Sequence, residues 1–341
     1  MKIAVLGAGS LGTVVGALLT KGGLDVVMVD VREETVEALN RKGAQLLGNL
    51  DLVQPVRAVT PGGMEGIYDL VVYLVKATYD AEALPQVLPH LGEGSALITL
   101  QNGVPEEKVA SFVGRDRTLG GAVLWSAELS GPGISRMTSD PDQMGYDIGE
   151  LDGTITERIK VVKSVLDHAG TATITENLTG VRWTKLLFNV GASGLSTALG
   201  ATGGEVMDND KAADAVILVM IEAVLTARVL GIGLEPMRGV DPGVLLDIAR
   251  QDMGNMRNVL RSVIGDFREA KASMLQDLEK GLPCEVESIN GYLSAMAAKA
   301  GVAVPVNDQV TQIIRDIQGG KRSLDFSNLD LVELPPVSSY F

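Results

Sequence analysis

The chain has 341 residues, of which 46% are hydrophobic and 21% are charged, and its formal net charge is −14. This length exceeds what a single hydrophobic core usually supports, so two domains are expected. The negative charge disfavours binding to nucleic acid or to an anionic membrane surface. The single cysteine, Cys284, excludes an intramolecular disulfide and favours a reducing, cytoplasmic location. No apolar run is long and clean enough to predict a membrane span.

Short β-branched runs alternate with helical patterns in the first half of the chain, which predicts a parallel sheet with crossover helices. The predicted strands are 2–6, 26–30, 70–74, 96–99, 118–121 and 146–148, and the predicted helices are 10–21, 33–42, 79–88 and 105–113.

Beyond about residue 175 the patterns are helical only, and they predict helices at 184–197, 211–230, 242–251, 256–267, 283–299 and 307–317. The fold class is therefore α/β: a Rossmann-type, doubly wound parallel sheet over residues 1–176, followed by an all-helical domain over 177–320. Residues 321–341 are expected to form a C-terminal tail that follows the surface. The apolar helix 211–230 fits either a homodimer contact or burial within the helical domain.

A glycine-rich turn, Gly7-Ala8-Gly9-Ser10-Leu11-Gly12, directly follows the first predicted strand and opens the first predicted helix. Gly7 permits the tight turn, Gly9 lets the backbone approach a pyrophosphate, and Gly12 lets helix and strand pack closely. The N–H groups at the start of the helix then receive the anion. In this context the turn predicts a dinucleotide site.

The cofactor is predicted from the end of the second strand. Asp30 has the spacing at which a carboxylate accepts hydrogen bonds from the adenosine ribose hydroxyls and repels a 2′-phosphate, which favours NAD over NADP. Arg32 keeps NADP open as the alternative, because its guanidinium could reach a 2′-phosphate if Asp30 turned away.

Only two histidines are present, His90 and His168, and neither has a carboxylate partner at an informative spacing. A His–Asp acid/base pair and a His-rich metal site are therefore disfavoured, and no metal site is predicted. Another group has to supply the proton.

Lys185 is the best candidate for that proton donor. It opens the helical half of the chain among large apolar residues, with Asn189 and Ser193 following at four-residue intervals on the same predicted helical face. A lysine in such a setting equally often extends its ammonium to solvent. Downstream, Glu285 is expected in the first turn of a helix after Pro283, where pairing with the helix dipole is the commoner role.

Several short motifs occur together in the order found in the ketopantoate reductase family, which the chain resembles to about residue 320. They are the turn 7–12, Val75-Lys76-Ala77, Gln101-Asn102-Gly103-Val104, Trp183-Thr184-Lys185-Leu186 with Asn189, Ser273-Met274-Leu275-Gln276-Asp277, Glu285 with Ile289-Asn290-Gly291, and Val304-Pro305-Val306-Asn307.

The resemblance implies a role for each matching residue. It makes Lys185 the catalytic lysine that protonates the ketone oxygen and Glu285 the glutamate that orients substrate and lysine. It implies that Asn189 contacts the substrate, Ser273 binds near the substrate carboxylate, Asn102 lies near the nicotinamide and the substrate, and Lys76 contacts the cofactor.

Two positions depart from the family pattern. Ser193 stands where the family commonly has a second asparagine, and Val29-Asp30-Val31-Arg32 stands where its better-known members have an arginine for the NADPH phosphate. The first departure concerns the substrate pocket and the second concerns the cofactor.

The resemblance implies an enzyme that transfers a hydride from NAD(P)H to a small 2-oxo acid, with ketopantoate the leading substrate. One alternative is an NAD-dependent 2-hydroxyacid dehydrogenase of the same family that acts on another branched or bulky 2-oxo acid. The other is a protein that binds NAD without turnover, against which the presence of both Lys185 and Glu285 argues.

Overall fold

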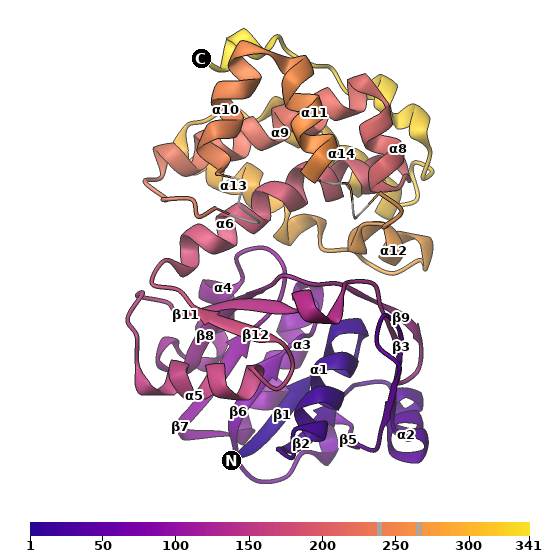
Figure 1. The fold of residues 1–341 in the computed structure, drawn as a ribbon, viewed down its shortest axis with the longest axis vertical. Helices are drawn as coiled ribbons and strands as arrows, with labels where there is room; N and C mark the ends of the chain where they lie inside the picture. The colour runs from indigo at the N-terminus through magenta and orange to yellow at the C-terminus, as the bar shows by residue number, and fades with distance from the viewer. Residues whose placement is uncertain (237–240, 264, 266–267) are drawn as a thin grey trace. The chain divides into compact units, whose positions relative to one another are not determined.

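The computed structural model describes residues 1–236, 241–263, 265 and 268–341. The chain divides into two compact units, Met1–Leu178 and Thr179–Phe341 (Figure 1). Within the described residues, no helix combines the length and the apolar character needed to cross a membrane.

The first unit is built on a sheet with strand order β12-β11-β8-β7-β6-β1-β2-β5. The six strands from β5 to β8 are parallel and have the doubly wound order, which confirms the predicted Rossmann-type domain. Strand β11 runs antiparallel to β8, and β12 pairs with β11. The strands are β1 Lys2–Leu6, β2 Asp25–Val29, β5 Arg57–Val59, β6 Tyr68–Tyr73, β7 Leu91–Thr99, β8 Thr118–Val123, β11 Gly145–Glu150 and β12 Thr171–Ile174.

Helices cover both faces of this sheet (Figure 1). Alternate residues of β1 point to opposite faces: Ile3 and Val5 join the core beneath α1 and α5, whereas Ala4 and Leu6 join the core beneath α3 and α4. The helices of the first unit are α1 Ser10–Lys21, α2 Glu33–Lys42, α3 Asp80–Val87, α4 Glu106–Val113 and α5 Glu157–Leu166. Both faces of the sheet are buried, as its continuous apolar strands predict.

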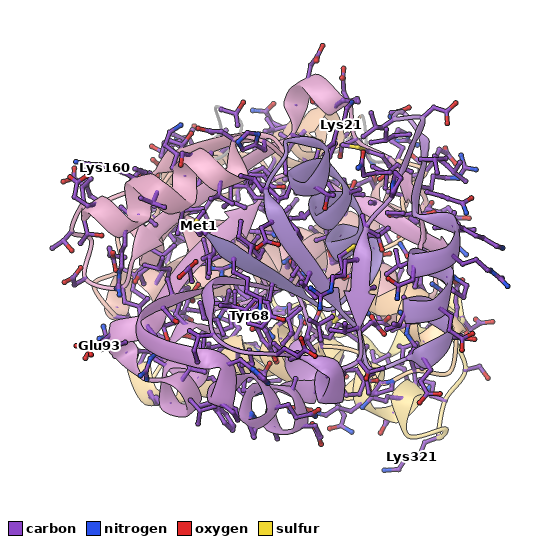
Figure 2. All side chains as sticks on the ribbon, turned by 90° about the horizontal axis from the view of Figure 1, so that it is seen from below. Met1, Lys21, Tyr68, Glu93, Lys160 and Lys321 are labelled. Carbon is purple, nitrogen blue, oxygen red and sulfur yellow. The ribbon has the colours of Figure 1, made fainter. Side chains whose placement is uncertain are left out.

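Charged side chains of the first unit extend outward around this core (Figure 2). Lys21, Glu93 and Lys160 are exposed, while Tyr68 is buried in β6. The ammonium of Lys2 lies 4.4 Å from the centre of the Tyr68 ring, a favourable cation–π distance.

A second sheet in the first unit was not predicted from the sequence. It has the order β4-β3-β10-β9 and packs against α1. Its strands are β3 Ala44–Gly48, β4 Leu52–Gln54, β9 Ala127–Gly131 and β10 Ile134–Met137. These strands have only three to five residues each, too few to show a clear alternation of apolar and polar side chains. Ser135 of β10 donates a hydrogen bond to the carbonyl of Ser10, so the sheet supports the start of α1.

The second unit is helical throughout its described residues, as predicted. Its helices are α6 Leu178–Phe188, α7 Gly194–Leu199, α8 Gly203–Asp208, α9 Asp210–Val229, α10 Pro242–Gln251, α11 Met253–Val263, α12 Ser273–Glu279, α13 Asn290–Ala300 and α14 Pro305–Gln318. Most of α9 is buried within this one chain. Its apolar residues are therefore accounted for without a dimer.

Two predicted helices differ from the structure, and a third is described only in part. The helix predicted over 184–197 starts earlier, at Leu178, and a π-helical turn at Asn189–Ser193 separates α6 from α7. The helix predicted from Pro283 is wrong at its start, because a 3₁₀ turn at Val286–Ser288 comes first and α13 begins at Asn290. Glu285 therefore precedes a 3₁₀ turn and does not lie in the first turn of a long helix. The predicted helix 256–267 is observed as α11, and residues 264, 266 and 267 lie outside the described residues.

The C-terminal segment packs on the second unit. Val332 is buried, and Glu333 exchanges two hydrogen bonds with the side chain of Gln309 in α14. Two 3₁₀ turns, Phe326–Leu331 and Val337–Tyr340, organise this segment. It is therefore anchored by specific contacts as well as lying on the surface.

Candidate active site

The predicted cofactor residues follow four neighbouring strands of the first sheet. The glycine turn follows β1, Asp30 follows β2, Lys76 comes after β6, and Asn102 comes after β7. Because β2, β1, β6 and β7 are adjacent and parallel, their carboxyl ends meet at one edge of the sheet. In doubly wound folds, ligands bind at this edge.

The backbone of the glycine turn requires glycine at two of its three positions. Gly7 has φ +92°, and a Cβ there would lie 2.9 Å from the Val75 nitrogen. A Cβ on Gly12 would lie 1.9 Å from the Gly7 carbonyl oxygen, which no side chain can tolerate. Both residues are therefore fixed by packing within the protein.

Gly9 differs, because a Cβ at this position would meet nothing within 4 Å. Gly9 precedes α1, whose first N–H groups have no side-chain cap. Unbonded N–H groups at a helix N-terminus, next to open space, match the requirements of a pyrophosphate. The turn therefore fits the diphosphate of a dinucleotide.

Asp30 and Arg32 form a compact pair at the end of β2. The backbone N–H and the Nε of Arg32 both donate to Oδ1 of Asp30, at 3.0 and 3.1 Å. Asp30 is 7% exposed and the Arg32 side chain 43%. The carboxylate thus holds the arginine at this edge of the sheet.

A buried hydrogen-bond network around Asp80 fixes the loops that carry Lys76 and Asn102. Oδ1 of Asp80 accepts from Tyr73 at 2.9 Å and from Gln101 at 2.7 Å, and Gln101 also donates to the carbonyl of Val75. Lys108 pairs with Oδ2 of Asp80 at 2.8 Å. Burial and the neighbouring carboxylate raise the pKa of Tyr73, which therefore stays a donor. Sequence reasoning missed this network, whose only signal was an aspartate at the start of a predicted helix.

Lys185 lies in α6 of the second unit and is partly buried among apolar residues. Trp183, Leu186 and Leu187 on either side of it are each at most 2% exposed. Thr184 anchors this part of the helix, because its hydroxyl donates to the carbonyl of Glu235 at 2.7 Å and accepts from the Glu235 N–H at 3.0 Å. The lysine is therefore held on a rigid element.

The electrostatic surroundings of Lys185 lower its pKa to about 7. Burial is the largest cause, and the positive charge of Arg182 lowers the pKa further, while the carboxylate of Glu285 opposes both. Arg182 lies one helical turn before Lys185 and is fully buried. It was not singled out from the sequence, because its local sequence does not distinguish a buried arginine from a solvated one.

Asn189 and Ser193 are the first and last residues of the π-turn, Asn189–Ser193. The N–H of Gly194 bonds to the carbonyl of Asn189, five residues back, so the helix is locally wider here. Ser193 is thus displaced from the position that an unbroken α-helix would give it. π-helical turns inside α-helices are frequent at functional sites.

Glu285 is 4% exposed, and its charge acts on both Lys185 and Cys284. Burial raises the pKa of Cys284 to about 11, so its thiol stays protonated near neutral pH. Ser273 is exposed at the first residue of α12, a helix that packs against α7. Within the second unit, then, Glu285 is close enough to Lys185 to act on its charge, and Ser273 lies on a separate element.

Each of the two histidines makes a contact within the first unit. Nδ1 of His90 lies 2.8 Å from the carbonyl oxygen of Gly66. His168 follows the end of α5, and its ring fills the space beside Gly22. Among the residues that the structure describes, no cluster of His, Cys, Asp or Glu could hold a metal ion.

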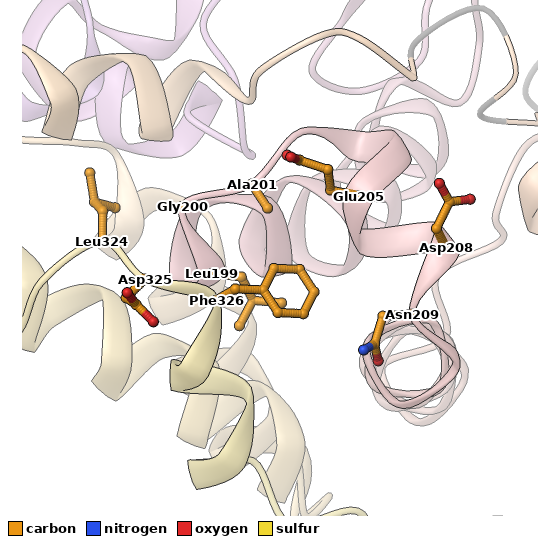
Figure 3. Close-up of a pocket in the computed structure, with 9 residues that line it drawn as sticks. All are labelled: Leu199, Gly200, Ala201, Glu205, Asp208, Asn209, Leu324, Asp325 and Phe326. Carbon is orange, nitrogen blue, oxygen red and sulfur yellow. The ribbon is translucent and has the colours of Figure 1, made fainter.

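A hollow of about 690 Å³ in the second unit involves none of the predicted site residues (Figure 3). Its carboxylates already have local roles: Glu205 caps α8, Asp208 pairs with Arg268, and Asp325 caps the 3₁₀ turn Phe326–Leu331. The hollow therefore offers no unused charge for a ligand.

The first unit has a doubly wound sheet with a glycine turn at its carboxyl edge, and the second unit is helical and contains a lysine of lowered pKa. Together these features define a dinucleotide-dependent oxidoreductase. Comparison with known proteins agrees. Residues 3–153 match the model of the family "Ketopantoate reductase PanE/ApbA", and residues 177–318 match the model of its C-terminal part. The chain belongs to the ketopantoate reductase family, and its cofactor is a nicotinamide dinucleotide.

Curated relatives extend over nearly the whole chain. The 2-dehydropantoate 2-reductase of Mesorhizobium japonicum is 25% identical over 338 residues, covering 92% of this chain and 97% of its own. The 2-dehydropantoate 2-reductase of Archaeoglobus fulgidus is 29% identical over 328 residues, covering 94% and 98%.

Solved structures share the fold. The 2-dehydropantoate 2-reductase of Geobacter metallireducens has a TM-score of 0.80 and 26% identity, covering 93% of this chain and 99% of its own. A D-mandelate dehydrogenase, solved with NADH and anilino(oxo)acetate, has a TM-score of 0.81 and 23% identity, covering 94% and 99%.

Proposed function

We propose that the protein reduces ketopantoate (2-dehydropantoate) to pantoate with a nicotinamide cofactor, using Lys185 as the general acid and Glu285 to orient it. The observation that carries the proposal is the pKa of Lys185, lowered to about 7 beside the buried Glu285. A general acid works best when its pKa lies near the working pH. The curated relatives named 2-dehydropantoate 2-reductase support the substrate.

When bound, a reduced nicotinamide would supply a hydride to C2 of the 2-oxo acid. As the C2–H bond forms, the carbonyl π electrons move to oxygen, and the Lys185 ammonium stabilises that charge and donates a proton from Nζ. Lys185 is left as a neutral amine, which regains its proton from water. Glu285 favours the ammonium form, whereas burial and Arg182 make its proton easier to give up.

The remaining predicted residues serve binding. We assign Asn189, Ser193 and Ser273 to the substrate, Asn102 to the nicotinamide and the substrate, and Lys76 to the cofactor. Residues 7–12 receive the diphosphate at the start of α1, where Gly9 leaves room for it. We assign NADH as the favoured donor, because Asp30 places a carboxylate where NADPH would bring its 2′-phosphate.

A second substrate class is favoured by one residue. Ser193 has a shorter side chain than the asparagine common in the family, and it lies at the end of the π-turn. A smaller side chain there would admit a bulkier 2-oxo acid, which favours an NAD-dependent 2-hydroxyacid dehydrogenase of the same family.

A panel of 2-oxo acids assayed with NADH tests both proposals, with Lys185→Ala as the key variant. We expect turnover of ketopantoate to exceed that of bulkier acids, and Lys185→Ala to lower kcat by on the order of a hundredfold or more. The exposed Lys160→Ala serves as the matched control, and NADH binding, measured by fluorescence, should be unchanged in both variants.

The other outcomes are equally informative. Near-normal kcat in Lys185→Ala would refute the general acid, and a preference for bulky acids would favour the second class. Binding of NADH without turnover of any acid in the panel would leave a non-catalytic NAD-binding protein.

A further inference from the structure

The π-turn, Asn189–Ser193, is held by a side chain from another helix. Asn290, the first residue of α13, is fully buried, and its Nδ2 donates to the carbonyl of Val190 at 3.0 Å. The same amide group lies against Gly194, where a Cβ would come within 2.8 Å of Nδ2. Asn290 therefore packs against both ends of the turn.

Asn307 in α14 fixes the orientation of Asn290. Nδ2 of Asn290 donates to Oδ1 of Asn307 at 2.9 Å, and Nδ2 of Asn307 donates to the backbone carbonyl of Asn290 at 3.0 Å. Asn307 also donates to the hydroxyl of Ser294 at 2.9 Å. These bonds hold the two fully buried side chains in fixed orientations.

Glu222 in α9 holds Asn307 in turn. Its carboxylate accepts from the backbone N–H groups of Val306 and Asn307, at 2.9 and 2.8 Å. These are the second and third residues of α14, and the residue at its N-cap, Val304, has no side chain that could cap it. A carboxylate from another helix therefore caps α14 and stabilises its positive end.

Tyr340, near the C-terminus, completes the connection, because its hydroxyl donates to Oε1 of Glu222 at 2.7 Å. The family match ends at residue 318, so this last contact comes from outside the matched region. A continuous series of hydrogen bonds, part-buried at Tyr340 and buried from Glu222 onward, thus runs from Tyr340 through Glu222, Asn307 and Asn290 to the carbonyl of Val190.

We propose that this series, the Tyr340–Asn290 relay, positions the π-turn and so sets the affinity of the enzyme for its 2-oxo acid. The proposal rests on the function assigned above, because Asn189 and Ser193 on the turn are taken to bind the substrate. None of the four relay residues is assigned to touch the substrate, so they act as positioning residues. Removing one member leaves a buried partner unsatisfied and loosens the next bond in the series.

Two variants with matched controls test the relay. Tyr340→Phe removes only the terminal hydroxyl, and its control is Tyr146→Phe, which removes a buried hydroxyl that donates to Ala169 in the first unit. Asn290→Ala removes the contact to Val190, and its control is Asn328→Ala, which removes a buried amide that donates to the carbonyl of Ala198 in α7.

The first measurement is amide hydrogen exchange of a peptide that covers residues 189–195, made without substrate. We expect exchange to quicken at least about fivefold in Tyr340→Phe, the effect of losing one hydrogen bond, and more in Asn290→Ala. In the controls the exchange of this peptide should stay at the wild-type rate. Equal exchange in Tyr340→Phe and Tyr146→Phe would overturn the relay, even if Asn290→Ala failed to fold.

The second measurement separates positioning from a general loss of stability. In Tyr340→Phe we expect KM for the 2-oxo acid to rise about fivefold, with kcat and the Kd of NADH nearly unchanged. A fall in kcat with unchanged KM would contradict the assignment. If wild-type protein reduces no 2-oxo acid, the proposed function fails, and hydrogen exchange still decides the relay.

Discussion

We expect the choice between NADH and NADPH to depend on Asp30. Its carboxylate lies at the end of β2, and Oδ1 already accepts two bonds from Arg32. In Asp30→Ala the negative charge is gone and Arg32 is released, so its guanidinium can pair with a 2′-phosphate. We expect the ratio of kcat/KM for NADH to that for NADPH to fall by on the order of tenfold or more, the effect of a charge-assisted hydrogen bond.

Arg32→Ala is the control for this change. It keeps the carboxylate and removes the cation, so the preference for NADH should persist and NADPH should gain nothing. A wild-type enzyme with a strong preference for NADPH would refute the assignment of NADH to Asp30.

The lowered pKa of Lys185 predicts how kcat/KM for reduction changes with pH. Its pKa is lowered to about 7, and in the proposed role of general acid Lys185 must be protonated for reduction. We therefore expect kcat/KM for 2-oxo acid reduction to be high below pH 7 and to fall as pH rises through about 7. Oxidation of the 2-hydroxy acid requires the neutral amine and should show the opposite profile.

Variants of the two neighbouring charges should move this profile in opposite directions. Arg182→Met removes a positive charge that lowers the pKa of Lys185, so the descending limb should move to higher pH. Glu285→Gln removes the charge that raises this pKa, so the limb should move to lower pH. A limb that stays in place in both variants would show that another group controls the rate.

Short sequence signals pointed to the candidate site residues themselves, but not to the buried residues that surround them. Lys185 stands out because a charge among large apolar residues is unusual, and the glycine turn has a fixed spacing. Arg182 and Asp80 act through burial and through contacts with residues distant in sequence. Nothing in their local sequence distinguishes a buried charge from a solvated one, so only the fold reveals them.

At the scale of elements, long periodic helices and buried parallel strands were predictable, whereas irregular elements were not. Predicted helices 10–21, 33–42 and 242–251 match α1, α2 and α10 residue for residue. The start predicted at Pro283 failed because Ile289, with φ −114° and ψ −89°, leaves the helical region just before α13. Proline predicts where a helix is permitted to begin, not where tertiary packing begins it.

The π-turn was hidden for the same reason. The apolar residues of 184–197 are spaced as in a continuous helix, and the local widening is imposed by packing. A Cβ on Gly191 would lie 2.9 Å from Met220 of α9, and one on Gly194 would lie 2.8 Å from Asn290. The two glycines let neighbouring helices approach the turn from α9 and α13. Their role follows from long-range contacts that no periodicity encodes.

At the scale of the molecule, Glu222 links stability to pH. It is fully buried, and burial raises its pKa from 4.5 to about 7. The Tyr340 hydroxyl and the N–H groups of Asn307 and Val306 oppose that rise in pKa, whereas the charge of Asp308 adds to it. Between pH 4.5 and 7 the folded protein keeps a proton that the unfolded chain releases. The free energy of unfolding therefore falls by on the order of 3 kcal/mol as pH rises through this window. Above pH 7, the contribution of Glu222 to the free energy of unfolding no longer changes with pH.

Glu222→Gln isolates this contribution, since glutamine does not titrate. Urea unfolding at pH 5 and pH 8 should show the free energy of unfolding of wild type, relative to Glu222→Gln, decreasing toward pH 8. The difference between the two proteins at a single pH also contains the lost hydrogen bonds, so only the change of that difference with pH reports the pKa of Glu222. A difference that is constant between pH 5 and pH 8 would show that Glu222 keeps an ordinary pKa, with the carboxylate stabilised by the N-terminus of α14 more than burial destabilises it.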